Sequence, residues 1–168
     1  GRLRVSPTLS EKGKSEPFLM EACLAADLRV RQNLAIETGC NQFCSYCIVP
    51  YARGSVRCRP ISEVVEEAKK MISSGVKEIV LTGINLGAYD HDFIRLLQLL
   101  TTSNYSLDTN IRFRLSSIEP MHVTNELIQE VANNPLICKH LHIPLQSGND
   151  KILKAMNRPY TKEDFTKM

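Results

Sequence analysis

Apolar and polar positions alternate along the chain with two spacings, one typical of strands and one typical of helices. Short segments, of which 78–82 (EIVLT) is the most continuously apolar, have the length of strands buried on both faces. The strands are predicted at 34–37, 78–82, 112–117 and 141–145. Between them, apolar residues recur three and four positions apart, which predicts amphipathic helices. The helices are predicted at 61–75, 92–100, 124–134 and 147–156.

Small and polar residues stand where the predicted helices should begin and end. Gly75 follows the first helix, where a C-terminal cap is wanted. Hydroxyl and carboxylate side chains can accept hydrogen bonds from the free amides of a first helical turn. Such signals stand at Thr124, at Ser147 with Asp150, and at Thr161 with Asp164. The last pair predicts that a new helix begins close to the end of the chain.

The predicted strands and helices alternate four times. This order is typical of an α/β fold in which right-handed helical crossovers join parallel strands. Residues 1–31 mix Ser, Pro, Lys and Glu and are expected to be a linker or the tail of a preceding domain. One folded domain is therefore predicted at 32–168. Because its last helix has hardly begun at Met168, we expect the natural protein to continue and the domain to be truncated there.

Composition restricts the class of protein only modestly. No apolar run reaches the roughly 18 residues of a membrane span, and the N-terminus lacks the apolar segment of a signal peptide. Six cysteines without such a signal predict reduced thiols and a cytoplasmic protein. Basic residues outnumber acidic ones in the first sixty positions. That excess fits an anionic partner such as nucleic acid, and it equally fits a solvated charged surface.

The stretch GCNQFCSYCIVPYARG, residues 39–54, holds Cys40, Cys44 and Cys47 in a C-x3-C-x2-C pattern. Four thiolates would complete a zinc site or a [4Fe–4S] cluster. Three leave one iron of such a cluster without a protein ligand, and an open metal position is where a small molecule binds. The alternatives are zinc with a histidine as fourth ligand, or three unconnected thiols. The remaining cysteines are expected to be structural or incidental: Cys23, Cys58 and Cys138.

Several motifs, in this order, resemble the radical S-adenosylmethionine (radical SAM) superfamily and, within it, the methylthiotransferases. They are GCNQFCSYCIVPYARG, EIVLTGINLGAY, RLSSIEP, HIPLQSGNDKILKAMNR and YTKEDF, and the resemblance covers 34–168. It implies a partial parallel (βα) barrel with about four of six expected units, a [4Fe–4S] cluster, and S-adenosylmethionine bound at the open iron. In that superfamily an electron from the cluster cleaves S-adenosylmethionine, and the resulting 5′-deoxyadenosyl radical abstracts a hydrogen from the substrate.

The resemblance also implies roles for individual residues. Carried over by position, Cys40, Cys44 and Cys47 hold the cluster, and no side chain is assigned a catalytic role. Seven residues are expected to bind S-adenosylmethionine: the backbone of Tyr46 at the adenine, Thr82, Gly83 and Asn85 at the methionine part, Ser117 and Glu119 at the ribose, and Gln146 in the same pocket. Barrels of this kind build their sites at the carboxyl ends of the strands. By pattern alone, the residues after 82 equally suit a turn.

Three arginines follow the cysteines in the segment PYARGSVRCRP: Arg53, Arg57 and Arg59. Arginine suits bidentate contacts to phosphate, so we expect these side chains to bind RNA, although a solvated loop is the alternative. Cys58 stands where the family is expected to have Ser, and we expect its thiol to be inert.

The resemblance implies an enzyme that adds a methylthio group to threonylcarbamoyladenosine in tRNA next to the anticodon, since LTGINLGAY and LSSIEP look most like that type. Isopentenyladenosine in tRNA and a ribosomal protein aspartate are the alternative substrates. Expected partners are tRNA and an electron donor such as flavodoxin or ferredoxin, and the full-length protein is expected to be a monomer. Family members carry a second [4Fe–4S] cluster on an N-terminal domain, expected here to be missing. A hypothesis of another class is a non-catalytic RNA-binding module with a structural metal.

Overall fold

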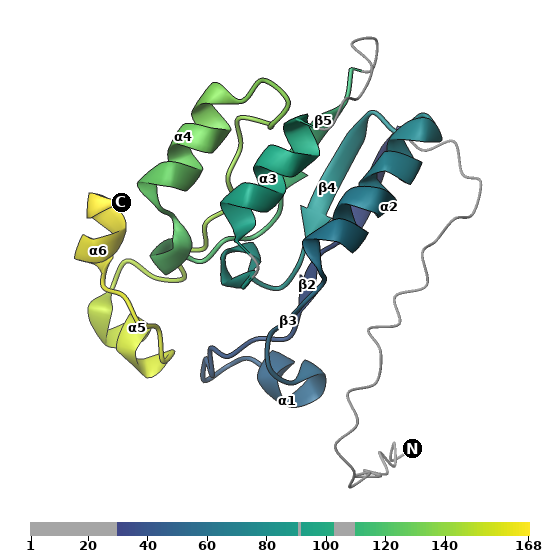
Figure 1. Ribbon diagram of the computed structural model, residues 1–168. Helices are drawn as coiled ribbons and strands as arrows, with labels where there is room; N and C mark the ends of the chain where they lie inside the picture. Colours follow the sequence, from purple (N-terminus) through teal and green to yellow (C-terminus); the bar gives the residue numbers. More distant parts are fainter. Residues whose placement is uncertain (1–29, 91, 103–109) are drawn as a thin grey trace, which may run out of the picture.

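A three-stranded parallel sheet lies at the centre of the fold (Figure 1). The computed structural model describes residues 30–90, 92–102 and 110–168. The sheet has the order β1-β4-β5, and its strands are β1 (Arg31–Ala35), β4 (Glu78–Thr82) and β5 (Arg112–Leu115). Both neighbouring pairs are parallel. The predicted α/β class with parallel strands is confirmed, and within the described residues the sheet stays open instead of closing into a barrel.

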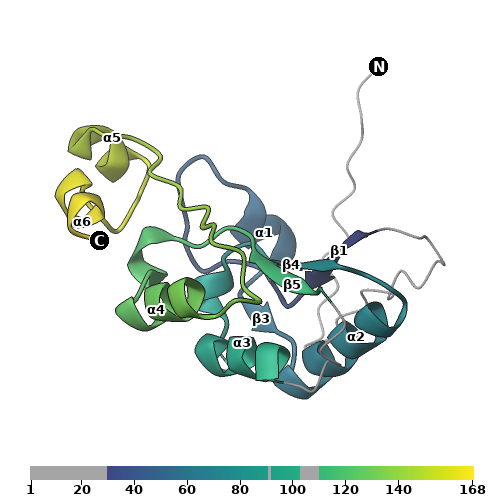
Figure 2. The ribbon, with the colours of Figure 1, turned by 90° about the horizontal axis from the view of Figure 1, so that it is seen from above.

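Three helices cover one face of the sheet (Figure 2). They are α2 (Ile61–Ser73), α3 (Phe93–Thr102) and α4 (Asn125–Asn133). The predicted apolar stripe of α3 is buried completely: Phe93, Leu96, Leu97 and Leu100. Full burial of such a side chain stabilises the fold by about 1.5–3 kcal/mol relative to exposure. The helical spacing in the sequence therefore places these helices against the sheet.

The ends of the helices follow the sequence signals with one exception. Gly75 follows α2 with a φ of 95°, a conformation that glycine adopts without steric cost. Thr124 caps α4 by accepting a hydrogen bond from the Leu127 amide at 3.2 Å. The capping box of Thr161 and Asp164 begins α6 (Lys162–Lys167) as predicted.

The exception is α5 (Asp150–Ala155), where the predicted cap at Ser147 is wrong. Asn149 is the cap, because its side-chain oxygen accepts a hydrogen bond from the Lys151 amide at 2.9 Å. Ser147 instead accepts from the Asn149 amide at 3.2 Å, so it orders the loop that precedes the helix.

The predicted fourth strand at 141–145 is also absent from the described structure. Within the described residues, this segment makes one isolated bridge, Ser117–His142, and a second bridge, Phe113–Ile137, precedes it. Pro144 lies within the segment and has no amide hydrogen to donate, which weakens pairing there. The predicted fourth unit therefore ends in an extended segment instead of a strand.

The first predicted strand is divided between two sheets. After β1, β2 (Glu37–Thr38) pairs antiparallel with β3 (Arg57–Cys58). The loop between β2 and β3 carries the three clustered cysteines and the short helix α1 (Val49–Arg53). Two 3-10 turns follow β4 and β5, at Leu86–Ala88 and Pro120–His122.

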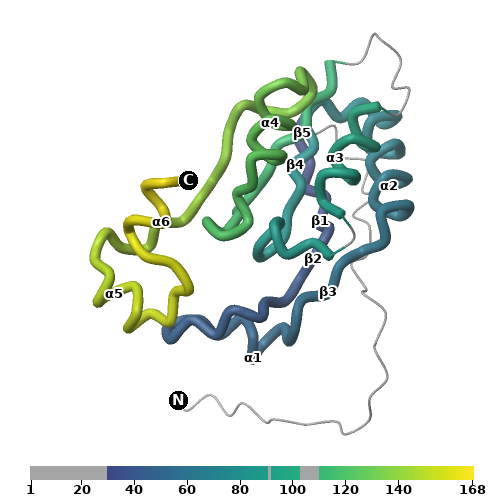
Figure 3. The backbone as a smooth tube through the Cα atoms, turned by 60° about the vertical axis from the view of Figure 1, so that its left-hand side comes forward, coloured from purple at the N-terminus to yellow at the C-terminus, as the bar shows by residue number. Residues whose placement is uncertain are grey.

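The C-terminal helices α5 and α6 lie beside the loop that precedes α1 (Figure 3). A hydrogen bond from the Ser45 amide to the Met156 carbonyl at 3.1 Å joins the two segments. In the described ranges, no helix combines the length and the apolar character needed to cross a bilayer. The expected linker at 1–31 falls outside the described residues except for its last two positions, so its boundary stays a prediction.

Candidate functional site

The cysteine loop, residues 39–48, begins directly after β2 and is closed at its base by backbone contacts. The Cys40 amide donates to the Gly54 carbonyl at 3.1 Å. Gly39 has a φ of 84°, and a side chain there would overlap the backbone of Ser55. Glycine at position 39 therefore permits the tight entry into the loop.

The three thiols of the loop are near one another without meeting at one point. Cys40 Sγ accepts a hydrogen bond from the Gln42 amide at 3.3 Å. Cys44 is buried, and its Sγ accepts from Nη1 of Arg158 at 3.1 Å. Over residues 30–90, 92–102 and 110–168, no three His, Cys, Asp or Glu side chains are arranged so that they could hold a metal ion as they stand.

The donor set nevertheless fits an iron–sulfur cluster, since thiolates are its usual ligands and all three come from one short loop. Burial raises the pKa of the Cys40 thiol, and the neighbouring thiols of Cys44 and Cys47 raise it further. A metal must therefore displace a proton that this thiol holds more firmly than usual.

Cys58 and Cys138 stand apart from this loop. Burial is the main reason why the pKa of Cys58 rises to about 12. Its Sγ lies 3.8 Å from the Ala88 carbonyl and accepts from the Asp90 amide at 3.4 Å. A thiol that stays protonated at neutral pH is a poor nucleophile and a poor ligand, which supports the prediction that Cys58 is inert. Cys23 lies outside the described residues.

Beyond the carboxyl end of β4, the loop with Thr82, Gly83 and Asn85 holds a buried glutamate that the sequence analysis did not single out. Glu37 is only 2% exposed, and its Oε1 accepts from the Asn85 amide at 2.6 Å. A side chain at Gly83 would overlap this carboxylate. Burial raises the pKa of Glu37, and its Oε2 has no hydrogen-bond partner among the described residues. The sequence feature that could have indicated Glu37 is its position at the end of the first predicted strand, just before the first clustered cysteine, Cys40.

Two loops beyond β4 and β5 are tied together through Asn85. Asn85 is 3% exposed, and its Oδ1 accepts from the Glu119 amide at 3.2 Å. Ser117, two residues beyond β5, has its hydroxyl 2.9 Å from Nδ1 of His142. Five of the seven predicted cofactor residues thus come together at one edge of the sheet: Thr82, Gly83, Asn85, Ser117 and Glu119.

The last two predicted cofactor residues are exposed. Tyr46 is 53% exposed on the cysteine loop. Gln146 has a φ of 64°, which is uncommon for a residue with a side chain. His140 and His142 are both exposed, and Nδ1 of His142 lies within hydrogen-bonding distance of the Ser117 hydroxyl. His91 lies outside the described residues.

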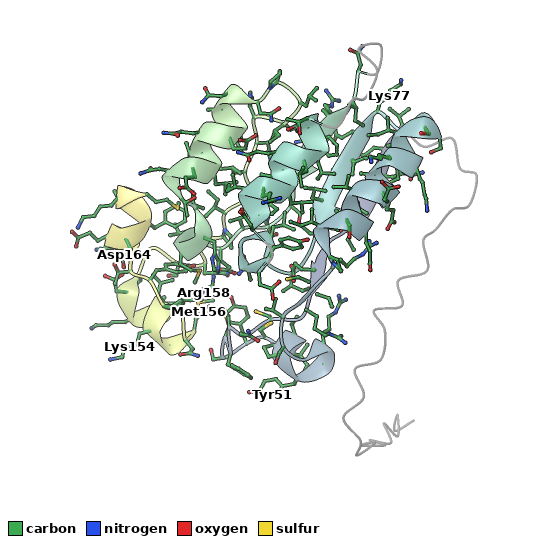
Figure 4. All side chains as sticks on the ribbon, in the orientation of Figure 1. Tyr51, Lys77, Lys154, Met156, Arg158 and Asp164 are labelled. Carbon is green, nitrogen blue, oxygen red and sulfur yellow. The ribbon has the colours of Figure 1, made fainter. Side chains whose placement is uncertain are left out.

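Arg158 is the residue that the sequence analysis missed most clearly. It follows α5, and its side chain is 2% exposed. Its guanidinium donates to Cys44, Glu119 and Tyr160. Figure 4 shows Arg158 and Met156 on the side of the C-terminal segment that faces the rest of the domain. No local pattern indicates this position, because Arg158 lies 114 residues from Cys44.

The three arginines predicted to bind RNA divide into two groups. Arg53 and Arg57 are exposed. Arg59 is 14% exposed and is held by Glu67 at 2.7 Å and by the Ala35 carbonyl at 3.0 Å. Its donors are used inside the domain, so the prediction that Arg59 contacts RNA is not supported by its position.

Two surface hollows lie between α3 and α4, and both are lined by Asp92, Arg95 and Gln98. Neither is lined by a residue of the cysteine loop or of the rim. The chemistry that the side chains offer is therefore at the cysteine loop, Glu37 and the loops beyond β4 and β5.

Two curated proteins are similar to most of this chain. The threonylcarbamoyladenosine tRNA methylthiotransferase MtaB of Bacillus subtilis is 44% identical over 142 residues, which cover 82% of this chain and 31% of that protein. The tRNA-2-methylthio-N(6)-dimethylallyladenosine synthase of Alkaliphilus oremlandii is 42% identical over 133 residues, 76% of this chain and 27% of that protein. The chain therefore spans less than a third of the length of these two relatives.

A solved structure shares the fold. The radical S-adenosylmethionine methyltransferase TsrM from Kitasatospora setae, with cobalamin and a [4Fe–4S] cluster bound, has a TM-score of 0.66 at 18% sequence identity. The match covers 79% of this chain and 26% of that chain. At this identity the likeness speaks for the fold alone.

A family model matches most of the chain. The model of the radical SAM superfamily covers residues 35–168, which include the cysteine loop, Glu37 and every rim loop described above. This superfamily uses a [4Fe–4S] cluster and S-adenosylmethionine, the two cofactors that the cysteine pattern and its resemblance predicted. The chain belongs to the radical SAM superfamily.

Proposed function

We propose that this chain is the cluster-bearing part of a tRNA methylthiotransferase whose substrate is threonylcarbamoyladenosine next to the anticodon. The 44% identity to MtaB over 142 residues is the observation that supports it most. The relative that acts on dimethylallyladenosine is almost as similar, at 42%, so this nucleoside is the alternative substrate. A ribosomal protein aspartate is a more distant alternative.

In this proposal Cys40, Cys44 and Cys47 hold the cluster, and the open position accepts S-adenosylmethionine. When bound, the cluster would supply the electron for cleavage of S-adenosylmethionine. The chain's own residues fix the loop: Gly39 permits its entry, and the Cys44 carbonyl accepts from the Cys47 amide at 3.0 Å. This turn keeps the second and third ligands adjacent.

The rim residues bind and orient S-adenosylmethionine. Thr82 and Gly83 contact its methionine part, and Ser117 contacts its ribose. Gln146 lines the same pocket, and the backbone of Tyr46 faces the adenine. Asn85 is buried and acts through the loops that it connects. The carboxylate of Glu119 is engaged by Arg158, so its contact to ribose uses the remaining oxygen.

The outer face of the cysteine loop receives RNA. Phe43 and Tyr51 are exposed and stand edge to face, with ring centroids 5.8 Å apart. Tyr51, labelled in Figure 4, lies on α1 together with Arg53. Unstacked bases of RNA loops stack on aromatic side chains, while arginines hold the phosphates. An electron donor such as flavodoxin or ferredoxin completes the set of partners. We expect the protein to act as a cytoplasmic monomer.

Two assays separate the reaction class from the substrate. The purified chain, reconstituted with iron and sulfide without air, should release 5′-deoxyadenosine from S-adenosylmethionine when dithionite is added. A colourless protein that binds zinc and RNA would favour a non-catalytic module instead.

For the substrate, the full-length protein is expressed in a bacterium without its own tRNA methylthiotransferases, and tRNA nucleosides are analysed by mass spectrometry. Methylthio-threonylcarbamoyladenosine is expected, and the methylthio form of isopentenyladenosine alone would reassign the substrate.

The chain alone should not methylthiolate tRNA. Its cysteines outside the loop, Cys23, Cys58 and Cys138, are scattered along the chain, whereas the family's sulfur-donating second cluster is held by three further cysteines on an N-terminal domain. A methylthio nucleoside formed by the isolated chain would contradict the claim that the sulfur-donating cluster is held outside this chain.

A further inference from the structure

The C-terminal segment and the cysteine loop are joined by hydrogen bonds between three successive residues on each side. The Met156 carbonyl accepts from the Ser45 amide at 3.1 Å. Asn157 Nδ2 donates to the Phe43 carbonyl at 2.8 Å, and Arg158 Nη1 donates to Cys44 Sγ at 3.1 Å. The middle residue of the loop segment, Cys44, is thus fixed from both neighbours and by its own sulfur. This arrangement is more specific than contact between two surfaces.

The guanidinium of Arg158 uses all three of its nitrogens. Nη2 donates to the Glu119 carboxylate, Nε to the Tyr160 hydroxyl at 3.2 Å, and Nη1 to the Cys44 sulfur. The Tyr160 hydroxyl in turn donates to the Pro144 carbonyl at 2.9 Å, and the guanidinium carbon lies 5.1 Å from the Tyr160 ring centroid. The direction of the cation is therefore set by two partners that are not metal ligands.

A buried cation is costly unless charged or polar groups pair with it. Glu119 supplies one negative charge, and the Cys44 sulfur and the Tyr160 hydroxyl accept the other two hydrogen bonds. The fork of arginine reaches separate partners in fixed directions, which the single ammonium of lysine cannot reproduce. The three directed hydrogen bonds of Arg158 therefore hold the Cys44 sulfur in one position.

We propose that Arg158 is a positioning residue for the iron–sulfur cluster, which holds Cys44 in place and raises the cluster's reduction potential. The proposal rests on the proposed function, since it needs Cys44 to be a cluster ligand. Hydrogen bonds to cluster sulfurs and nearby charge are recognised determinants of that potential. Reduction adds one negative charge to the cluster, and a fixed cation at 3.1 Å from a ligand sulfur stabilises the reduced state relative to the oxidised one.

The test is a redox titration of the reconstituted chain, followed by electron paramagnetic resonance of the reduced cluster. Arg158→Gln should lower the midpoint potential by at least the equivalent of a tenfold shift in the one-electron equilibrium, about 59 mV. Arg158→Lys keeps the charge without the fork and should give a smaller shift. Arg95→Gln, an exposed arginine on α3, is the matched control and should leave the potential unchanged.

Other outcomes are equally decisive. If Arg158 only stabilised the fold, Arg158→Gln would unfold at a lower temperature while its midpoint potential stayed unchanged. That result would overturn the proposal. If Arg158→Gln binds less iron while its apoprotein unfolds like the unchanged chain, the positioning role is supported and the potential is read on Arg158→Lys. A midpoint potential of Arg158→Lys lowered by 59 mV or more would then count against the electrostatic role, because lysine keeps the positive charge. Failure of the unchanged chain to bind any cluster would contradict the proposed function itself.

Discussion

Asn85 and Glu119 join the loops beyond two neighbouring strands: the side-chain oxygen of Asn85 accepts a hydrogen bond from the Glu119 amide at 3.2 Å. The Asn85 amide itself donates to Glu37 at 2.6 Å. One buried residue thus connects β2, the loop after β4 and the loop after β5. Any ligand bound at this edge depends on that connection for the relative position of its contacts.

Asn85→Ala should therefore weaken S-adenosylmethionine binding while leaving the iron content intact. The change leaves the Glu119 amide without its acceptor, and a buried donor left unpaired costs about 1–3 kcal/mol, which corresponds to roughly 5- to 150-fold in affinity. Calorimetric titration of the reconstituted chain measures this. Asn133→Ala, on the exposed side of α4, is the control. Equal affinity in both variants would mean that Asn85 serves only the turn.

Gly83→Ala should destabilise the domain, because the added methyl group would overlap the Glu37 carboxylate. Overpacking a buried site costs about 1–3 kcal/mol in the free energy of unfolding. The cost should shrink when Glu37 is first changed to Ala, and urea unfolding of the four variants of this cycle measures the coupling. Gly148→Ala is the matched control, since a side chain there meets no atom within 4 Å. An additive cycle would show that Glu37 is not the obstacle.

Glu78 should make stability depend on pH. Its carboxylate accepts from Nε of Arg114 and of Arg112, both at 2.7 Å, and lies 3.2 Å from Arg31. The hydrogen bond from Arg114 is the main reason why the pKa of Glu78 is lowered on folding. The folded state therefore gains stability above the unfolded-state pKa, and that gain is lost as the pH falls through the lower folded-state pKa.

At neutral pH, Glu78→Gln should reduce the free energy of unfolding by about 1.5–3 kcal/mol, the range for hydrogen bonds to charged groups. The difference from the unchanged chain should disappear in acid, once Glu78 is protonated in both states. Urea unfolding over a pH series follows this. Glu66→Gln, which removes an exposed pair with Lys69, should leave stability almost unchanged. A loss at Glu78 that persists in acid would assign it to packing instead of charge.

Arg53→Gln and Arg57→Gln should each weaken tRNA binding and reduce its dependence on salt. Each exposed arginine that neutralises a phosphate releases a counterion, so the slope of log affinity against log salt should become shallower by roughly 0.7–0.9 per residue. Filter binding at several salt concentrations gives the slope. Arg95→Gln on α3 is the control. Identical slopes for all three variants would place the RNA on another surface.

The sequence predicted the elements whose signals are local. The stripe Phe93, Leu96, Leu97 and Leu100 defines α3, because helical spacing and burial express the same geometry. The run 78–82 coincides with β4, since a strand between two neighbours is apolar on both faces. The segment 141–145 has similar composition but no full ladder, because pairing depends on neighbouring strands and Pro144 removes one donor.

The candidate site likewise contains residues that local sequence patterns predicted and residues that only long-range contacts reveal. Three cysteines within eight residues, and the motifs around them, were sufficient to predict the family and its cofactors. The contact between Arg158 and Cys44 spans 114 residues, and no spacing rule reports it. Arg59 looks like its neighbours in sequence, yet Glu67 and the Ala35 carbonyl hold it within the domain. Long-range partners decide which of several similar side chains remains free.

Iron and sulfide analysis of the chain after anaerobic reconstitution tests the central claim most directly. The unchanged chain should bind one [4Fe–4S] cluster, and Ala at Cys40, Cys44 or Cys47 should each abolish it, because two thiolates leave two irons without protein ligands. Cys58→Ala and Cys138→Ala, matched changes outside the loop, should bind as much iron as the unchanged chain. If Cys58→Ala or Cys138→Ala loses iron as completely as Cys44→Ala does, or if the unchanged chain takes up zinc and no cluster, the assignment of the cysteine loop is contradicted.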